Sequence, residues 1–201
     1  MATKGEKSRQ RILHEAAEIF ARQGFGATTV NDLLQATGTT KGNLYFHFAG
    51  KEAIGMAVLS KARDGFRLFL DSALQGPTPG AGLDHFFTRA LDRNRERGFG
   101  GGCLFGNTAL EASGTDLPYA DLVREVFAEW IGKLQQTIAA AQACGEVRRD
   151  LPADQLAELV VGAIEGGIMQ SRLKQEEGPL KRVFASLRVL LELKPYPGEY
   201  S

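Results

Sequence analysis

The residues with the most distinctive chemistry are concentrated in a short stretch near the N-terminus, from residue 39 to residue 51. Hydroxyl, ammonium and amide side chains stand close together there, and each can donate a hydrogen bond to a phosphate or a base edge. A glycine among them would let the backbone come close to a duplex. These residue types predict nucleic-acid contacts by Thr39, Thr40, Lys41, Gly42 and Asn43.

Two aromatic residues with polar tips and one further cation follow in the chain. Tyr45 and His47 could reach phosphates that flank the bases. Lys51 would begin the next helix, where backbone amides already favour an anion. The apolar side chains of the stretch are expected to pack inward, and these are Leu44, Phe46 and Phe48.

Three short helical segments must position these side chains. Apolar residues recur at spacings of three and four over residues 7–23, and Gly24 marks a helix end. Thr29 and Asp32 have capping-box spacing ahead of a second helix that ends near Gly38. Hydroxyl caps open a third helix that is too short to be stable by itself. This order is typical of a helix-turn-helix, in which the last helix enters the major groove.

The rest of the chain is predicted to be helical as well, so the expected fold class is all-α. No alternating strand pattern or Asn-Gly hairpin occurs. Residues 76–82 are rich in glycine and proline and form the clearest break. The later helices are expected at about residues 51–72, 83–97, a short stretch from Cys103, 118–143 with Pro118 in the first turn, 152–174 and 179–193.

Composition and charge limit the classes of function. Of the 201 residues, 43% are hydrophobic and 24% are charged, as in an ordinary globular protein. No apolar stretch approaches the roughly 20 residues of a membrane span, and the N-terminus lacks the apolar run of a signal peptide. Two cysteines are too few for a disulfide framework, so we expect a cytoplasmic protein with reduced thiols and no membrane partner. The net charge is zero, but residues 1–51 hold seven basic and four acidic side chains, which suits contact with phosphates.

Catalysis is not expected. His14, His47 and His85 are far apart in the chain, and none has a helical metal-ligand partner. No phosphate loop, dinucleotide fingerprint or nucleophile elbow occurs in the sequence. We therefore predict no catalytic residue, no metal site and no cofactor.

Residues 10–56 resemble the TetR family of transcriptional regulators. The resemblance implies a dimeric repressor with a palindromic operator and a small-molecule inducer. It also implies a helix-turn-helix DNA-binding domain over residues 1–52, with the reading motif at about 29–48, and a ligand-binding and dimerisation domain over residues 53–201. The family's DNA contacts fall at Thr28, Thr40, Lys41, Tyr45, His47 and Lys51, whereas Asn43 occupies a more variable position. The residues that carry the resemblance are Ile12, Leu13, Ala16, Phe20, Gly24, Phe25, Thr28, Thr29, Val30, Leu33, Thr40, Lys41, Gly42, Leu44, Tyr45, Phe48, Lys51 and Glu52.

The inducer is expected in the second domain, where apolar and aromatic residues outnumber what a thin bundle needs. Aromatic residues at helical spacing are equally typical of an ordinary core. The predicted ligand-binding residues are Phe66, Phe69, Phe87, Cys103, Asn107, Trp130 and Met169.

Cys103 has a second interpretation. It follows a glycine run at the start of a short helix, and a helix N-terminus makes a thiolate more available. The Gly-Cys-Leu segment, with Glu111 further on, resembles a TetR branch that includes sensors of electrophiles, aldehydes or small unsaturated acids. Cys103 is then a thiol switch, or else a small buried apolar residue.

The last two helices are predicted to form the dimer interface. Both have apolar stripes, and glycines in the first of them would permit close helix approach. Two helices from each protomer would make a four-helix bundle, although a monomer could use the same residues in its own core. The predicted interface residues are Leu156, Leu159, Val160, Ala163, Gly167, Phe184, Leu187 and Leu191.

The sequence therefore predicts a ligand-responsive, DNA-binding transcriptional repressor. A small molecule or modification of Cys103 would release it from double-stranded operator DNA. The alternatives are a helical protein–protein adaptor that binds no DNA, and a regulator that activates transcription.

Overall fold

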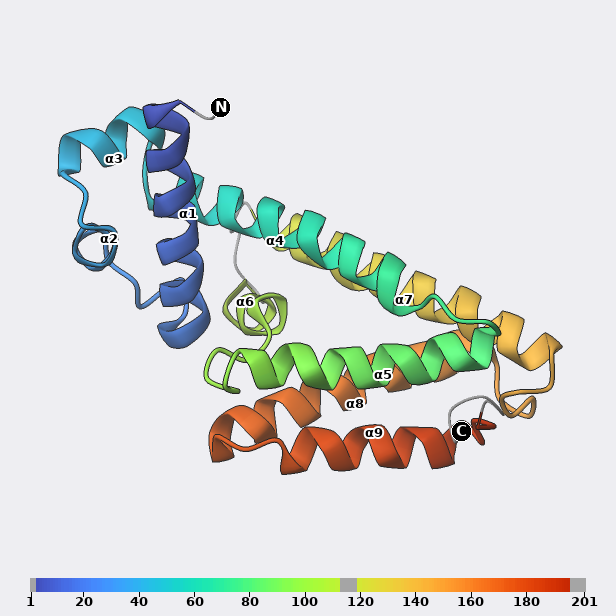
Figure 1. The fold of residues 1–201 in the computed structure, drawn as a ribbon. Helices are drawn as coiled ribbons and strands as arrows, with labels where there is room; N and C mark the ends of the chain where they lie inside the picture. The colour runs from blue at the N-terminus through green and yellow to red at the C-terminus, as the bar shows by residue number, and fades with distance from the viewer. Residues whose placement is uncertain (1–2, 113–118, 196–201) are drawn as a thin grey trace. The chain divides into compact units, whose positions relative to one another are not determined.

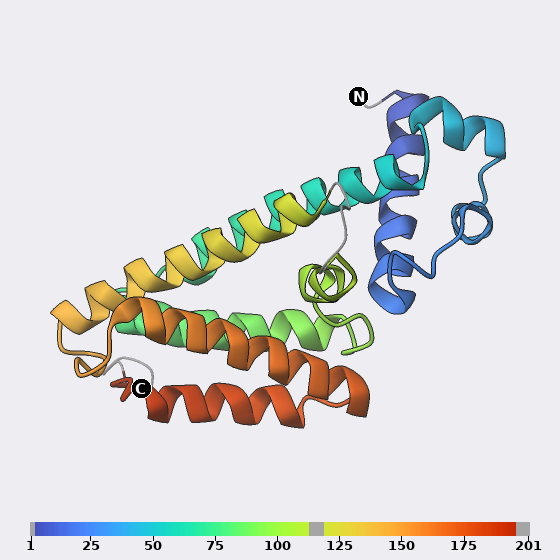
Figure 2. The same cartoon turned by 180° about the vertical axis from the view of Figure 1, so that it is seen from behind.

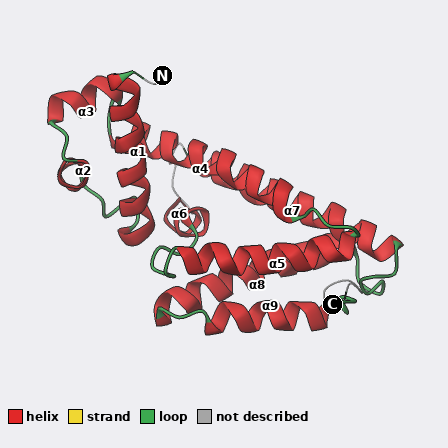
Figure 3. Ribbon diagram, viewed as in Figure 1, coloured by secondary structure: helices red, strands yellow, loops and turns green. Residues whose placement is uncertain are grey.

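The computed structural model describes residues 3–112 and 119–195, and Figures 1 and 3 show helices joined by turns, with no strand in these ranges. The all-α prediction is thus confirmed. The chain divides into two compact units, residues 1–64 with 103–125, and residues 65–102 with 126–201. Helices α4 (Lys51–Ala73) and α7 (Ala120–Ala143) run through both units. The compact units differ from a division at residue 52, because α6 (Leu104–Ala112) packs with α1.

The first unit begins with α1 (Lys4–Gln23), α2 (Val30–Thr37) and α3 (Lys41–His47). Helix α1 starts at Lys4, before the predicted residue 7, because a capping box precedes it. The hydroxyl of Thr3 accepts a hydrogen bond from the Glu6 amide at 3.2 Å, and the Glu6 carboxylate accepts one from the Thr3 amide at 2.6 Å.

The second and third helices begin where their caps predict. The Thr29 hydroxyl accepts from the Asp32 amide at 3.1 Å, and the Asp32 carboxylate accepts from the Thr29 amide at 2.8 Å. Thr40 caps α3 by accepting from the Asn43 amide at 3.2 Å. Gly38, with φ +58°, provides the left-handed residue that ends α2. The predicted helix-turn-helix is therefore present.

The second unit is built on α5 (Pro79–Glu96), α8 (Ala153–Lys174) and α9 (Gly178–Leu190), together with parts of α4 and α7. Helices α8 and α9 lie side by side in both views, and α5 packs on α9 (Figures 1 and 2). Their common core is apolar and rich in aromatic rings, with Leu83, Phe86, Phe87, Leu134, Val160 and Phe184 fully or almost fully buried.

Helix α5 starts earlier than the glycine-rich break predicts. Thr78 caps it, with its hydroxyl accepting from the Ala81 amide at 3.2 Å, and Pro79 occupies the first turn. Gly82 then lies inside the helix, where a Cβ atom would come within 2.3 Å of the Leu74 carbonyl oxygen. The glycine is needed for the close approach of α5 to the backbone that follows α4, and it does not interrupt the helix.

No helix in the described parts of the chain is both long and apolar enough to cross a lipid bilayer. Pro118, predicted in the first turn of its helix, lies outside the described residues, and α7 is described from Ala120 onward.

Candidate nucleic-acid interface

Helix α3 presents polar side chains to solvent while a single residue, Leu44, is fully buried beneath it. Because α3 has only seven residues, it depends on that packing rather than on its own hydrogen bonds. Its outward surface has hydrogen-bond donors, and the backbone is exposed at Gly42. The predicted DNA-binding residues that are exposed on this surface are Thr40, Lys41, Gly42 and Tyr45.

Phe46 belongs to this surface as well, because 81% of it is exposed. The expectation that it packs inward is wrong, and helical geometry gives the reason. Successive residues of an α-helix are rotated by about 100°, so Phe46 lies on the side opposite to Leu44. Leu44 and Phe48, four residues apart, take the inward positions. An exposed aromatic ring on a predicted reading helix can contact a thymine methyl group or a sugar.

Thr39, Asn43 and His47 are half-buried at the base of the same surface. The Asn43 amide nitrogen donates to the Thr39 hydroxyl at 2.6 Å and to the Ser8 hydroxyl on α1 at 2.9 Å. Asn43 thus connects the start of α3 to α1. The ring of His47 lies edge-on to that of Phe46, with centroids 5.1 Å apart.

Thr28, also predicted to contact DNA, is buried in the turn between α1 and α2. Only 1% of it is exposed, and its hydroxyl donates to the Gly24 carbonyl at 2.6 Å while accepting from the Gln23 side-chain Nε2 at 3.3 Å. The chain folds back after α1, and Thr28 closes the turn. In this arrangement its hydroxyl is used within the protein.

Lys51 is also committed to the turn between α1 and α2. Its ammonium donates to the carbonyls of Phe25 at 3.0 Å, Gly26 at 3.4 Å and Thr28 at 2.9 Å, and it lies 4.6 Å from the centre of the Phe25 ring. A lysine has three N–H donors, so these three carbonyls use all of them. The predicted phosphate contact would therefore require Lys51 to leave the turn.

Glu111, on α6, binds the same turn through its carboxylate, which accepts from backbone amides. Its carboxylate accepts from the Phe25 amide at 3.0 Å and from the Gly26 amide at 2.6 Å. Gly24, at φ +89°, allows the approach, since a Cβ atom there would lie 2.5 Å from the carboxylate. Sequence reasoning assigned no structural role to Glu111, because its partners are 85 and 86 positions away in the chain.

Tyr119 packs against the aromatic ring of Phe25 in this turn. Its ring packs edge-on against Phe25, with centroids 4.7 Å apart, and its hydroxyl is buried without a hydrogen-bond partner among the described residues. Burial, with smaller effects from the Glu111 and Glu52 carboxylates, raises the pKa of Tyr119 to about 12. The phenol therefore stays neutral at physiological pH.

Cys103 and Asn107, two predicted ligand residues, lie at the start of α6 in the first unit. The Cys103 sulfur accepts from the Gly106 amide at 3.4 Å, so it occupies a capping position, and the thiol is half-buried. The Asn107 side-chain amide donates to the Ala21 carbonyl at 3.3 Å, near the end of α1. Asn107 and Glu111 are four residues apart, so α6 holds the end of α1 and its turn with one face.

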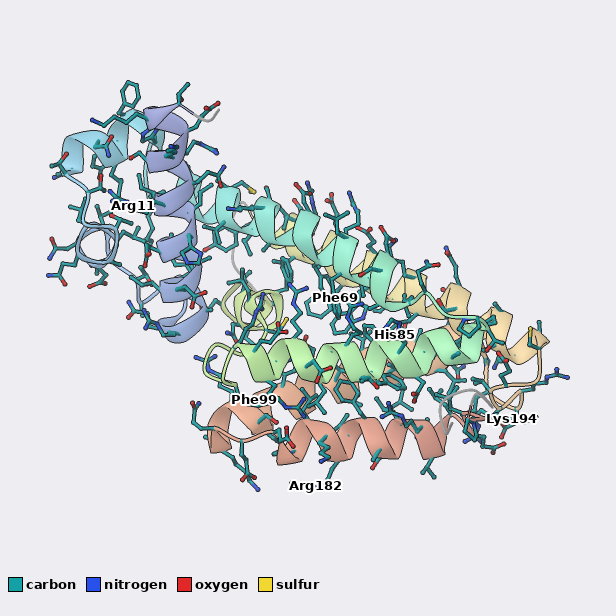
Figure 4. All side chains as sticks on the ribbon, in the orientation of Figure 1. Arg11, Phe69, His85, Phe99, Arg182 and Lys194 are labelled. Carbon is teal, nitrogen blue, oxygen red and sulfur yellow. The ribbon has the colours of Figure 1, made fainter. Side chains whose placement is uncertain are left out.

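The other predicted ligand residues lie in the second unit and do not all come together. Phe66 packs edge-on against Trp130 at 5.3 Å and lies 6.2 Å from Phe69 (labelled in Figure 4). The Trp130 indole nitrogen is buried and has no hydrogen-bond partner in the described residues. Phe87 is fully buried against Phe184. Met169 points elsewhere, on the exposed side of α8.

The predicted dimer-interface residues are divided between the core and the surface of the second unit. Six of them are buried in the core of the single chain, and these are Leu156, Val160, Gly167, Phe184, Leu187 and Leu191. Gly167 allows α9 to approach, since a Cβ atom there would lie 3.0 Å from side-chain atoms of Leu180 and Val183. Ala163 is half-buried, and Leu159 is exposed.

A different face of α8 is open and apolar. Leu159, Met169 and Leu173 are exposed, and Leu173 most of all, at 84%. Gly162 and Gly166 lie between them, with nothing within 4 Å of a Cβ atom built on either. These five residues recur at alternating spacings of three and four, which places them in one stripe. We call them the α8 stripe.

Comparison with known families matches most of the chain. Residues 12–58 match the family described as bacterial regulatory proteins, tetR family. Residues 79–187 match the family described as tetracyclin repressor-like, C-terminal domain.

Individual relatives are regulators of transcription. The chain is 30% identical to the HTH-type transcriptional repressor DhaR of Mycobacterium sp. (strain GP1), over 86% of each chain. It is also 30% identical to the transcriptional regulator AcuR of Cereibacter sphaeroides, over 85% of this chain and 79% of that one. Among solved structures, the regulatory protein TetR from Rhodobacter sphaeroides superposes with a TM-score of 0.85 at 27% identity, covering 91% of this chain and 98% of that one.

The hydrogen bonds that Glu111 accepts from the turn predict that this residue stabilises the fold. Glu111→Gln removes the charge and places an NH2 group against one backbone N–H, so one donor loses its acceptor. We expect the free energy of unfolding to fall by about 1–3 kcal/mol, measured by urea denaturation followed by circular dichroism. The control is Glu18→Gln, an exposed residue of α1, for which we expect a change within about 0.5 kcal/mol. Equal stability of the two variants would contradict this role for Glu111.

Proposed function

The chain belongs to the TetR family of transcriptional regulators, and we propose that it is a homodimeric repressor which a small molecule releases from a palindromic operator. One observation carries the DNA-binding part. The α3 surface exposes Lys41, Tyr45 and Phe46 together, while Leu44 anchors the helix from beneath. A helix held in this way can enter the major groove with its donors and one ring toward the bases. The relative DhaR is a transcriptional repressor, which supports repression by this chain as well.

The homodimer is supported by the α8 stripe. A row of exposed apolar side chains with two glycines between them would let a second α8 approach closely. On α9, Ala185 and Val189 are exposed as well, and Arg182 projects from the same helix (Figure 4). Because a twofold dimer uses the same patch on both copies, such a stripe can be self-complementary. Two reading helices related by a twofold axis require a palindromic site.

Ligand binding is proposed at the aromatic cluster of Phe66, Phe69 and Trp130. The buried indole N–H of Trp130 lacks an acceptor among the described residues, and a buried polar group usually has one. A ligand oxygen could supply it. The rings would enclose an apolar body, which suggests an inducer with one hydrogen-bond acceptor on an apolar or aromatic frame.

For DNA to be released, a movement of α6 must change the position of α3. The turn between α1 and α2 connects these two helices. Asn107 and Glu111 hold the end of α1 and the turn, and α2 and α3 follow directly. A change that moves α6 would therefore move the backbone amides that Glu111 binds. Ligand binding shifts the equilibrium only if the inducer favours the conformer with α6 moved.

Modification of Cys103 is a second way to move α6. The thiol occupies the capping position of that helix, so a group added to its sulfur would displace the Gly106 amide. Protein–DNA contacts would then be lost through the same turn.

The reading surface is tested by substitutions on α3. Lys41→Ala and Phe46→Ala are each expected to weaken binding of the operator fragment at least tenfold, about 1.4 kcal/mol, and Tyr45→Phe less. Fluorescence anisotropy on genomic fragments selected with the wild-type protein measures this. The matched controls are Arg97→Ala and Leu110→Ala, which remove an exposed cation and an exposed apolar side chain elsewhere. If all four alanine variants bind equally, α3 does not read DNA; if the wild-type protein selects no fragment, the adaptor alternative holds.

The dimer is tested on the α8 stripe. Met169→Glu with Leu173→Glu places like charges across the proposed interface, so the mass in solution should fall from twice 21.8 kDa to 21.8 kDa. Light scattering after size exclusion measures it. Leu68→Glu, an equally exposed leucine on α4, should leave the dimer intact. A dimeric double variant would show that the interface lies on another face.

The thiol route is tested with N-ethylmaleimide. We expect the treated wild-type protein and Cys144→Ser to lose operator affinity about tenfold or more, and Cys103→Ser to keep it. Cys144 is the exposed cysteine of the described residues and controls for modification elsewhere. Equal loss of affinity in Cys103→Ser and the wild-type protein would exclude a switch at Cys103, while leaving the ligand route in place.

A further inference from the structure

A groove lined in part by residues of α1, which the function proposed above does not use, lies between the start of α1 and the end of α3, entirely within the first unit. Its volume is about 610 Å3. One wall consists of Lys4, Lys7 and Arg11 of α1, and the other of Asn43, Phe46 and His47 of α3. We call it the α1–α3 groove. Figure 1 shows the two helices meeting there, and Arg11 is labelled on α1 in Figure 4.

The α1 wall is cationic. Lys4, Lys7 and Arg11 are spaced three and four residues apart, so they lie on one face of the helix, and all three are exposed. No acidic residue lines the groove. Within the described residues, none of the three cations has an ion-pair or hydrogen-bond partner through its side chain.

Three other cations of the first unit have partners. Lys51 donates to three carbonyls, Lys61 donates to the Gln10 side chain at 2.7 Å, and Arg63 pairs with Asp64 at 3.4 Å. The acidic residue nearest in sequence, Glu6, is occupied by the helix cap. Its hydrogen bonds from Thr3 hold the pKa of that carboxyl below its ordinary value, so it remains an acceptor for Thr3.

The groove is held in a fixed relation to the α3 surface. The Asn43 amide bonds to Ser8 at 2.9 Å, between Lys7 and Arg11 in the sequence, and so connects the two walls. Phe46 lines the groove and is exposed on α3 at the same time. An extended polyanion that lies along α3 would therefore continue past the three cations of α1.

We infer that the α1–α3 groove seats the phosphodiester backbone of the DNA next to the bases that α3 contacts, with Lys4, Lys7 and Arg11 neutralising phosphates. This inference rests on the proposed DNA binding and extends it to a second element. Phosphate contacts position a protein on a duplex without reading its sequence. The groove would thus set the orientation of α3 in the major groove, and the base-contacting residues would supply the sequence preference.

The test is a salt titration of DNA affinity with the variant Lys4→Gln/Lys7→Gln/Arg11→Gln in the full-length protein. Each lost phosphate contact makes the slope of log K against log salt concentration less negative by about 1. Three contacts are lost in each protomer, so we expect a change of about 6 for the proposed dimer. At about 0.1 M salt, affinity should fall about tenfold or more. The same factor is expected for the selected operator fragment and for an unrelated duplex of equal length.

The control variant, Arg89→Gln/Arg97→Gln/Lys194→Gln, removes the same charge from exposed positions of the second unit. Circular dichroism and solution mass verify that both variants keep their fold and assembly. A slope and an affinity equal to those of the control would overturn the proposal for the groove while operator binding by the wild-type protein stood. A loss confined to the operator fragment would also overturn it, since backbone contacts are independent of sequence. Failure of the wild-type protein to bind either duplex would instead contradict the proposed function.

Discussion

The turn between α1 and α2 is held by two oppositely charged side chains that bind opposite kinds of backbone group. The Lys51 ammonium uses its three donors on carbonyls, and the Glu111 carboxylate accepts from the amides of Phe25 and Gly26. Backbone groups removed from water need partners, and hydrogen bonds to charged groups are among the stronger ones. Because α2 and α3 follow the turn directly, their placement on α1 depends on these bonds. Helix α3, the proposed reading helix, is thus positioned by residues from α4 and α6.

Helix α3 illustrates how little of a binding surface is stable by itself. A helix of seven residues has almost no stability in isolation, so Thr40 must cap it and Leu44 must anchor it. Once these inward positions are filled, the remaining side chains are directed outward by the helical repeat. Phe46 becomes exposed for this reason alone, although its apolar ring would suit a buried position. The proposed reading surface is therefore a consequence of which residues the core uses.

In helix α8, too, the residues that the core uses determine which side chains are exposed. It has apolar residues on two sides, one packed against α9 and the core, the other the open α8 stripe. Periodicity detects apolar residues at helical spacing and cannot tell which side packs within the protomer. The packing of α9 on Gly167 decided it, because the close approach of Leu180 and Val183 commits that side to the interior. The glycines left on the open side, Gly162 and Gly166, then belong to the proposed interface.

The sequence by itself determined the helical elements and the helix-turn-helix, because caps, glycine ends and apolar spacing act between neighbours in the chain. Thr29 with Asp32, Thr40, and the polar residues Lys41 and Tyr45 could all be found in this way. The tertiary structure alone decided where Thr28 and Lys51 direct their donors, that Glu111 belongs to the turn, and which side of α8 stays open. Those outcomes depend on contacts between residues that are distant in sequence, and no local pattern encodes the distance between two helices.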